Sequence, residues 1–219
     1  MKPAPPGQRL RCPHCLRPHS ACICRWVCRI EHQVEVLILQ HPLELHNPKG
    51  SARLLHLCLP QSRLVNGEVL ALAELQDHLH APWGHAPAPQ LTLLLYPNTA
   101  GDPALPTPPE LPPAALNEPA RIRLVVLDGT WRKSRKMLYA NPLLQQLPRL
   151  ALQDMAPSNY QLRRAHRADQ LSTLEASCAA LMQLERQTAP FTPLLQAFDG
   201  FVMQQLAWQG ALISPAAAV

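Results

Sequence analysis

Three long apolar segments constrain the fold of this chain most strongly. Residues 34–40, 91–96 and 122–127 are rich in Val, Ile and Leu, and each reads as a buried β-strand. Residues 149–152 predict a weaker fourth strand. Near-continuous apolar strands separated by helix-length segments are typical of a parallel sheet covered on both faces. We therefore expect an α/β fold built on a parallel sheet.

Helices are expected between and after these strands. They cover residues 51–59, 131–140 and 192–208, and a further helix begins at Ser172, where Ser172-x-x-Glu175 forms a capping-box pattern. The aromatic side chains of the last helix, Trp208 among them, are expected in the core and not as platforms for bases. Residues 102–119 contain seven prolines and read as a loop inside one domain, because the strands on either side need the same sheet.

Four cysteines near the start form a metal-binding pattern. They are Cys12, Cys15, Cys22 and Cys24, two close pairs separated by six residues. Thiolates at this spacing can share one tetrahedral ion, and four cysteines leave no open position, so a structural zinc is expected. An iron–sulfur cluster and unligated thiols are the alternatives. Cys28, His14 or His19 could replace one ligand.

Composition limits the classes of protein further. The chain has 219 residues, a formal net charge of +5 and seven cysteines. No apolar run of 18 residues predicts a membrane span, and the first residues lack the apolar stretch of a secretory signal. Clustered cysteines without such a signal favour a reducing compartment, so a cytoplasmic location is expected. The moderate basic excess fits a nucleic-acid partner weakly.

Polar residues follow each long strand, where parallel sheets bind their ligands. His41-Pro42-Leu43-Glu44 follows the first strand, and Asp128-Gly129-Thr130-Trp131 follows the third. Asp128 could act as a base or ligand contact, or could simply cap the next helix. No Gly-x-Gly-x-x-Gly and no Gly-Lys-Ser/Thr phosphate loop occurs, so a dinucleotide fold and a P-loop NTPase are both disfavoured.

Two basic clusters suit a phosphate backbone. The first lies on the helix after Asp128, and the second precedes Ser172; their basic residues are Arg132, Lys133, Arg135 and Lys136, then Arg163, Arg164 and Arg167. A solvated basic face explains the first cluster equally well, and helix initiation explains the second.

The segment Asp128-Gly129-Thr130-Trp131, followed by Arg132-Lys133-Ser134, resembles the signature of the DTW-domain family. The cysteine cluster, Gln40-His41-Pro42-x-Glu44, Leu95-Tyr96-Pro97 and the block from Leu171 to Ala176 are similar to family blocks in the same order. The resemblance covers nearly the whole chain, although the loop at residues 102–119 looks expanded.

This family comprises tRNA-uridine aminocarboxypropyltransferases, distant relatives of the SPOUT class of knotted RNA-modifying enzymes. The resemblance implies an α/β catalytic domain with a trefoil knot over residues 31–219, preceded by a zinc-binding module at residues 1–30. It implies S-adenosylmethionine as donor of a 3-amino-3-carboxypropyl group, N3 of a tRNA uridine as acceptor, and 5′-methylthioadenosine as the leaving product.

The resemblance also suggests roles for individual residues. Asp128 is expected to take the proton from N3 or to hold the amino group of the transferred chain. Donor contacts are expected from Leu95, Tyr96, Pro97, Asp128, Gly129, Thr130, Trp131, Ser172, Thr173 and Glu175, and tRNA contacts from the two basic clusters. A SPOUT methyltransferase and a non-enzymatic zinc-containing RNA-binding protein are the alternatives.

Overall fold

The computed structural model describes residues 10–98, 102–152 and 171–213. Its five strands are β1 (Glu35–Gln40), β2 (Ser62–Asn66), β3 (Leu91–Leu95), β4 (Ile122–Asp128) and β5 (Arg149–Leu150). They form one sheet in the order β2-β1-β4-β3-β5, and every neighbouring pair is parallel. The expected parallel sheet is therefore confirmed.

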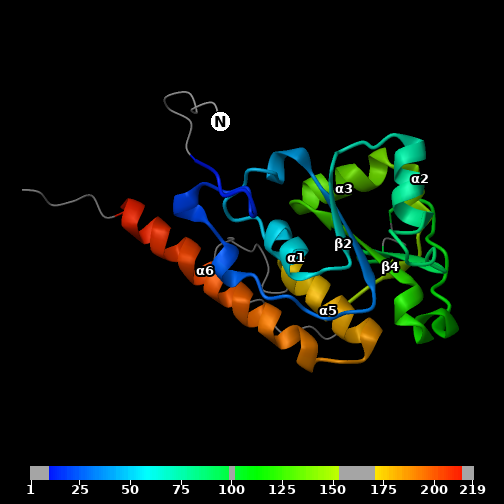
Figure 1. Cartoon of the computed structure of the whole chain (residues 1–219). Helices are drawn as coiled ribbons and strands as arrows, with labels where there is room; N and C mark the ends of the chain where they lie inside the picture. Colours follow the sequence, from blue (N-terminus) through cyan, green and yellow to red (C-terminus); the bar gives the residue numbers. More distant parts are fainter. Residues whose placement is uncertain (1–9, 99–101, 153–170, 214–219) are drawn as a thin grey trace, which may run out of the picture.

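Helices cover both faces of this sheet (Figure 1). One face carries α1 (Ala52–Cys58), α5 (Thr173–Glu185) and α6 (Thr192–Ile213), and the other carries α2 (Leu72–His80), α3 (Trp131–Ala140) and α4 (Pro142–Gln145). The side chains of β1 alternate between the two cores, as the pleat requires. Short 3₁₀ helices complete the described part: η1 (His19–Ala21), η2 (Cys24–Trp26), η3 (Pro42–Glu44), η4 (Pro113–Asn117), η5 (Pro119–Arg121) and η6 (Ala189–Phe191).

An ion pair lies inside the apolar sheet. Arg123 of β4 is fully buried, and its guanidinium donates to Oε2 of Glu35 on β1 at 2.6 and 2.8 Å. Two carbonyl oxygens near the end of α2 accept two further N–H groups of this guanidinium, and the ring of Trp83 lies against it at 4.1 Å. Burial of an arginine is tolerated here because each of these contacts replaces water.

The cysteine segment packs into the same core as the sheet. Ile23, Cys12 and Cys15 are buried in the core cluster that contains α1, α5 and α6. The indole N–H of Trp26 donates to the side chain of Gln204 on α6, whose amide in turn donates to the carbonyl of Cys22. Figure 1 shows this N-terminal segment, in blue, beside the end of α6. Residues before and after residue 30 therefore contribute to one core cluster.

The sequence missed β2, α2 and the short helix α4. β2 lies at the edge of the sheet, and α2 is a helix with only two buried residues, so neither carries the apolar signal of the central strands. The path of residues 153–170, which includes Arg163, Arg164 and Arg167, lies outside the described residues, and the trefoil knot remains a prediction. No helix in the described ranges combines the length and apolar character that crossing a membrane requires.

Candidate active site and metal centre

The ends of β1 and β4 form the centre of the candidate site. The two strands are neighbours, and their register aligns Gln40 with Asp128. After β1 the chain enters α1 on one face of the sheet, whereas after β4 it enters α3 on the other. Such a reversal is the position at which open parallel sheets bind ligands.

The carboxylate of Asp128 is held on both oxygens. Its side chain is among the buried polar groups, with the residue 2% exposed. The amide of Gln40 donates to Oδ2 at 2.8 Å, and the hydroxyl of Thr173 donates to Oδ1 at 2.7 Å. Since Thr173 begins α5, elements far apart in the sequence meet at this one group. Both hydrogen bonds stabilise the charged form of the carboxylate.

The start of α5 carries the capping box expected from the sequence. The hydroxyl of Ser172 accepts from the backbone N–H of Glu175 at 3.2 Å, and the Glu175 carboxylate accepts from the backbone N–H of Ser172 at 2.8 Å. Another backbone N–H of this first turn, that of Leu174, donates to the hydroxyl of Ser51. Ser172 and Glu175 thus fix the helix start that presents Thr173 to Asp128.

The turn after Asp128 packs tightly. A Cβ at Gly129 would lie 3.1 Å from Cβ of Lys133 and 3.6 Å from Cβ of His41, so this position has little room for a side chain. Thr130 is the N-cap of α3 and accepts from the backbone N–H of Lys133 at 3.4 Å. The cap predicted after β4 is therefore made by Thr130, which leaves the Asp128 carboxylate for other contacts.

An aromatic pair flanks this turn on the β3 side. Tyr96 follows Leu95 at the end of β3 and precedes Pro97. Its ring meets that of Trp131 edge to face, with centroids 5.7 Å apart. Tyr96 is buried and burial raises the pKa of its hydroxyl, whereas Trp131 is 51% exposed. An exposed indole on a buried aromatic support offers a surface on which a planar ring can stack.

The basic face of α3 is largely paired with acidic groups. Lys133 contacts the buried Glu44 at 2.8 Å, and Lys136 contacts Glu68 at 2.8 Å. The pKa of Glu68 is lowered by hydrogen bonds from Lys136 and from the imidazole of His41.

The remaining described cations of this face differ from one another. Arg135 contacts Asp102 at 2.8 Å and also donates to the hydroxyl of Tyr139. Arg132 is exposed. Three of the four cations of this cluster therefore already have carboxylate partners. Neither a phosphate-binding face nor a solvated basic face describes all four residues.

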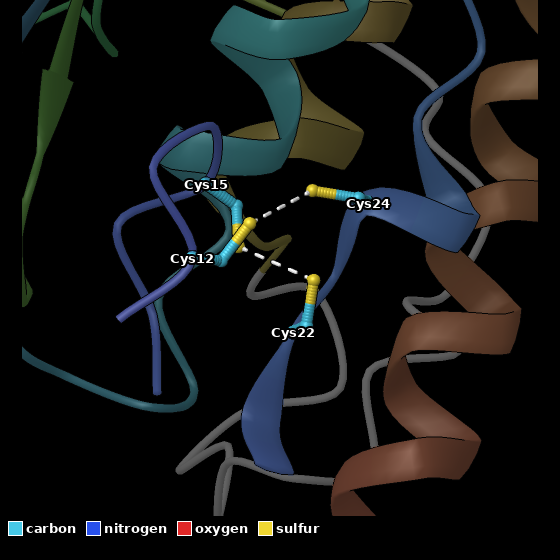
Figure 2. A group of neighbouring side chains, drawn as sticks. All are labelled: Cys12, Cys15, Cys22 and Cys24. Atoms are coloured by element: carbon cyan, nitrogen blue, oxygen red, sulfur yellow. Dashed lines mark hydrogen bonds between the residues drawn. The ribbon is translucent and has the colours of Figure 1, made fainter. Parts of the chain in front are cut away.

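The four cysteines converge as the spacing predicts (Figure 2). Sγ of Cys12 lies 3.5 Å from Sγ of Cys24, Sγ of Cys15 lies 3.7 Å from Sγ of Cys22, and all four sulfurs lie within 4.8 Å of one another. A tetrahedron with metal–sulfur bonds of about 2.3 Å has edges of about 3.8 Å. The donor set and its spacing therefore fit a single tetrahedral metal ion.

The surroundings of the cluster support this ligand set. Backbone hydrogen bonds from Cys15 and His14 lower the pKa of the Cys12 thiol to about 6, which favours a thiolate. Burial raises the pKa of Cys24 to about 12, an effect that a bound cation would oppose. Cys28 lies elsewhere, with its Sγ 4.0 Å from that of Cys58.

Comparison with known proteins decides the family. The DTW domain model matches residues 9–206. This chain belongs to the DTW-domain family. The resemblance read from Asp128-Gly129-Thr130-Trp131 is therefore confirmed, and the DTW match includes both the cysteine cluster and the Asp128 site.

Relatives of this DTW-domain protein carry one consistent name. It is 26% identical over 213 residues to tRNA-uridine aminocarboxypropyltransferase 2 of Macaca fascicularis, covering 92% of this chain and 65% of that protein. It is 30% identical over 192 residues to the Drosophila melanogaster protein of the same name, covering 83% and 69%. It is also 30% identical over 146 residues to tRNA-uridine aminocarboxypropyltransferase A of Arabidopsis thaliana, covering 63% and 53%.

The DTW relatives are longer than the part that this chain matches. The chain spans 65% and 64% of the two mammalian relatives, slightly less than two thirds of their length. No solved structure matches the chain.

Sequence reasoning missed the role of Gln40 in this DTW site. Its amide holds Asp128, yet the sequence marks this residue only as part of a family block. A polar residue at the end of an otherwise apolar central strand was the available signal, because such a side chain is buried only with a partner.

Proposed function

We propose that this DTW-domain protein moves the 3-amino-3-carboxypropyl group of S-adenosylmethionine to N3 of a uridine in tRNA. The names of its relatives support the reaction, since they agree across animals and a plant. The observation that carries the proposal is the buried Asp128 carboxylate, which two donors hold at the switch point of the sheet.

The proposed transfer balances as a substitution at carbon. A bond forms between N3 and the terminal carbon of the chain, and the bond from that carbon to sulfur breaks with its electron pair on sulfur. The sulfonium becomes the neutral thioether 5′-methylthioadenosine, and the N3 proton is released. Because the sulfonium is already a good leaving group, the main task of the protein is to orient the two substrates and accommodate the proton.

We assign Asp128 first to the amino group of the transferred chain. The hydrogen bonds from Gln40 and Thr173 stabilise its charged form, which suits a contact with an ammonium ion. The same bonds make the carboxylate a weaker base, so they count against Asp128 as the acceptor of the N3 proton. Of the two roles expected for Asp128, this proposal therefore favours the contact with the amino group over abstraction of the N3 proton.

The remaining donor contacts are proposed from the same edge. Trp131 and Tyr96 offer an aromatic surface for the adenine, with Leu95, Pro97, Gly129 and Thr130 around it. Thr173 is placed between the start of α5 and Asp128. The side chains of Ser172 and Glu175 bind each other's backbone, so their proposed contribution is to position Thr173.

The cysteine cluster is proposed to hold one structural zinc ion. Its four thiolates would complete the coordination, which leaves no position for a substrate. The zinc-binding module at residues 1–30, the trefoil knot, the tRNA contacts of Arg132 and the second basic cluster, and the cytoplasmic location are retained as parts of the proposal.

Analysis of the product tests the reaction. The purified protein is incubated with unmodified tRNA and S-adenosylmethionine, and the digested nucleosides are examined by mass spectrometry. The proposal expects an aminocarboxypropyl uridine. A methylated nucleoside would instead place the protein among the methyltransferases, and tRNA binding without any binding of S-adenosylmethionine would make it a non-enzymatic RNA-binding protein.

A pair of ligands tests the role of Asp128. Asp128→Asn keeps the shape of the side chain and removes its charge. If Asp128 holds the ammonium, this variant binds S-adenosylmethionine more weakly and binds 5′-methylthioadenosine, which lacks the amino acid chain, as the wild type does. If Asp128 is the base, both affinities stay unchanged in calorimetry and only the rate of transfer falls.

A further inference from the structure

A cavity lies next to the proposed donor site and reaches Gln40, whose amide holds Asp128. This cavity of about 470 Å³ opens between the loop of the first cysteine pair, the loop after β1 and the ends of β1 and β2. Gln40 and Asn66 line its floor at the strand ends, and Cys15 borders it from the metal cluster. Its volume is in the range of pockets that hold small ligands.

Arginines dominate the charge of this cavity. Arg11, Arg17 and Arg53 all line it. Arg17 donates to the carbonyls of Pro48 and Gly50 at 2.6 and 2.7 Å, and these bonds fix the wall formed by the loop after β1.

The other two arginines, Arg11 and Arg53, have N–H groups that can bind a ligand. The Nη2–H of Arg53 donates to the carbonyl of His14, but the Nε of Arg53 is buried and has no hydrogen-bond partner among the described residues. Arg11 is exposed at the rim. The acidic lining residue, Glu44, is already bound by Lys133 and by the amide of Asn47. The cavity therefore suits an anion, because a buried unpaired guanidinium N–H favours a ligand with acceptor oxygens.

The cavity also has an apolar side. Trp208 of α6 and Leu16 both line it, and Leu16 is 52% exposed although it is a large apolar residue. Its φ of 60° places it in the left-handed region, in the tight turn after Cys15. Aromatic and apolar side chains next to arginines are the combination that binds single-stranded nucleotides, with the base stacked and the phosphate held by charge. Trp208, expected in the core, thus lies at the cavity wall.

Gln40 connects the cavity to the reaction centre. It lines the cavity, and its amide donates to Oδ2 of Asp128 at 2.8 Å. Tyr96, which contacts Trp131 at the start of α3, follows β3, and β3 neighbours β4 on the side away from β1. In the proposed reaction S-adenosylmethionine and the tRNA uridine must both lie near Asp128. The donor is proposed on the side of Tyr96 and Trp131, so the cavity is available to the RNA.

We propose that this cavity receives a nucleotide of the RNA substrate, with Arg11 and Arg53 on its phosphate and Trp208 against its base. This inference rests on the proposed function. It places the principal RNA contact at the junction between the cysteine cluster and the sheet. The basic face of α3 is less suited to this contact, because Lys133, Arg135 and Lys136 are paired with carboxylates.

Binding of unmodified tRNA to the full, zinc-loaded protein tests the inference. Arg11→Ala should weaken binding roughly tenfold, the scale of one lost charge-assisted hydrogen bond, and should reduce the salt dependence by about one phosphate contact. Arg135→Ala removes the same charge from α3 and is the matched control, for which less than a twofold change is expected. Trp208→Ala should weaken binding as well, while Trp208→Phe should retain most of it.

The outcomes separate this inference from the proposed function. If the wild type binds and modifies tRNA but Arg11→Ala and Arg135→Ala weaken binding equally, the cavity assignment is overturned and the reaction stands. If the wild type binds no tRNA, the proposed function fails and takes the inference with it. Uridine monophosphate that bound as tightly as tRNA would mark a small-molecule site and would also overturn the assignment. Calorimetry with 5′-methylthioadenosine should give the same affinity for all these variants.

Discussion

Substitution of Gly200 by alanine tests how the cysteine segment is attached to helix α6 and the rest of the fold. Gly200 lies in α6 against the indole ring of Trp26, which belongs to η2. A Cβ at this position would lie 2.2 to 2.5 Å from three atoms of that ring. Intrinsic helix propensity and packing therefore predict opposite effects for Gly200→Ala.

The magnitudes decide the sign. Alanine in place of glycine within a helix stabilises by about 0.8–1 kcal/mol. Ordinary van der Waals contact begins at 3.4 Å, so the ring must move by about 1.2 Å to admit the methyl group. Overpacking of this kind costs about 1–3 kcal/mol. Movement of the indole would also break its hydrogen bond to Gln204, at about 0.5–1.5 kcal/mol. We expect a net loss of about 1–3 kcal/mol.

Urea unfolding of four proteins measures this effect. They are the wild type, Gly200→Ala, Trp26→Leu and the double variant, which together form a double-mutant cycle. Once the ring is removed, the added methyl group has room, so Gly200→Ala should then stabilise by about 0.5–1 kcal/mol. If Gly200→Ala raised stability in the wild-type background, the packing of Trp26 on α6 would be refuted.

Three further predictions concern the metal, the pH dependence and the donor site. Cys12→Ser with Cys15→Ser should abolish zinc binding, measured by metal analysis, and should lower the thermal midpoint, because both residues lie in the main core; full retention of stability would contradict this. Burial lowers the pKa of His32, so the protein should lose stability as the pH falls below 6.5, where the unfolded chain binds a proton that the folded chain resists. Urea unfolding at about pH 7.5 and about pH 5.5, on either side of the ordinary histidine pKa, should show a smaller loss for His32→Asn than for the wild type; equal losses would exclude His32 as the cause. Thr173→Val should weaken S-adenosylmethionine binding roughly tenfold, with Thr173→Ser near wild type, because only the former loses the hydroxyl that holds Asp128; unchanged binding by Thr173→Val would argue against the assigned role.

The sequence predicted the central sheet well because its signal is local. Apolar runs gave β1, β3 and β4 to within one or two residues, and the helix expected over residues 131–140 is α3. β2 was missed because an edge strand keeps one side toward solvent, so Ser62 and Arg63 break its apolar pattern. Arg123 reads as a polar interruption of a core strand, and only the neighbouring strand explains it, since Glu35 lies beside it in the sheet.

The site was predicted in part for a related reason. Metal ligands that are close in sequence can be recognised by their spacing, and Cys12, Cys15, Cys22 and Cys24 lie together as expected. Contacts between distant elements leave no such trace. The pairing of Lys133 with Glu44, and the hold of Gln40 and Thr173 on Asp128, depend on which strands are neighbours. The arginine-lined cavity is invisible for the same reason, because it forms only where the cysteine loop meets the ends of β1 and β2.

Transfer from doubly labelled S-adenosylmethionine tests the central claim most directly. The donor carries one label in the carboxyl group of its amino acid chain and another in its methyl group, and it is incubated with unmodified tRNA and the protein. We predict that the carboxyl label enters tRNA while the methyl label is recovered in 5′-methylthioadenosine. Entry of the methyl label into tRNA, with the carboxyl label left in solution, would contradict aminocarboxypropyl transfer.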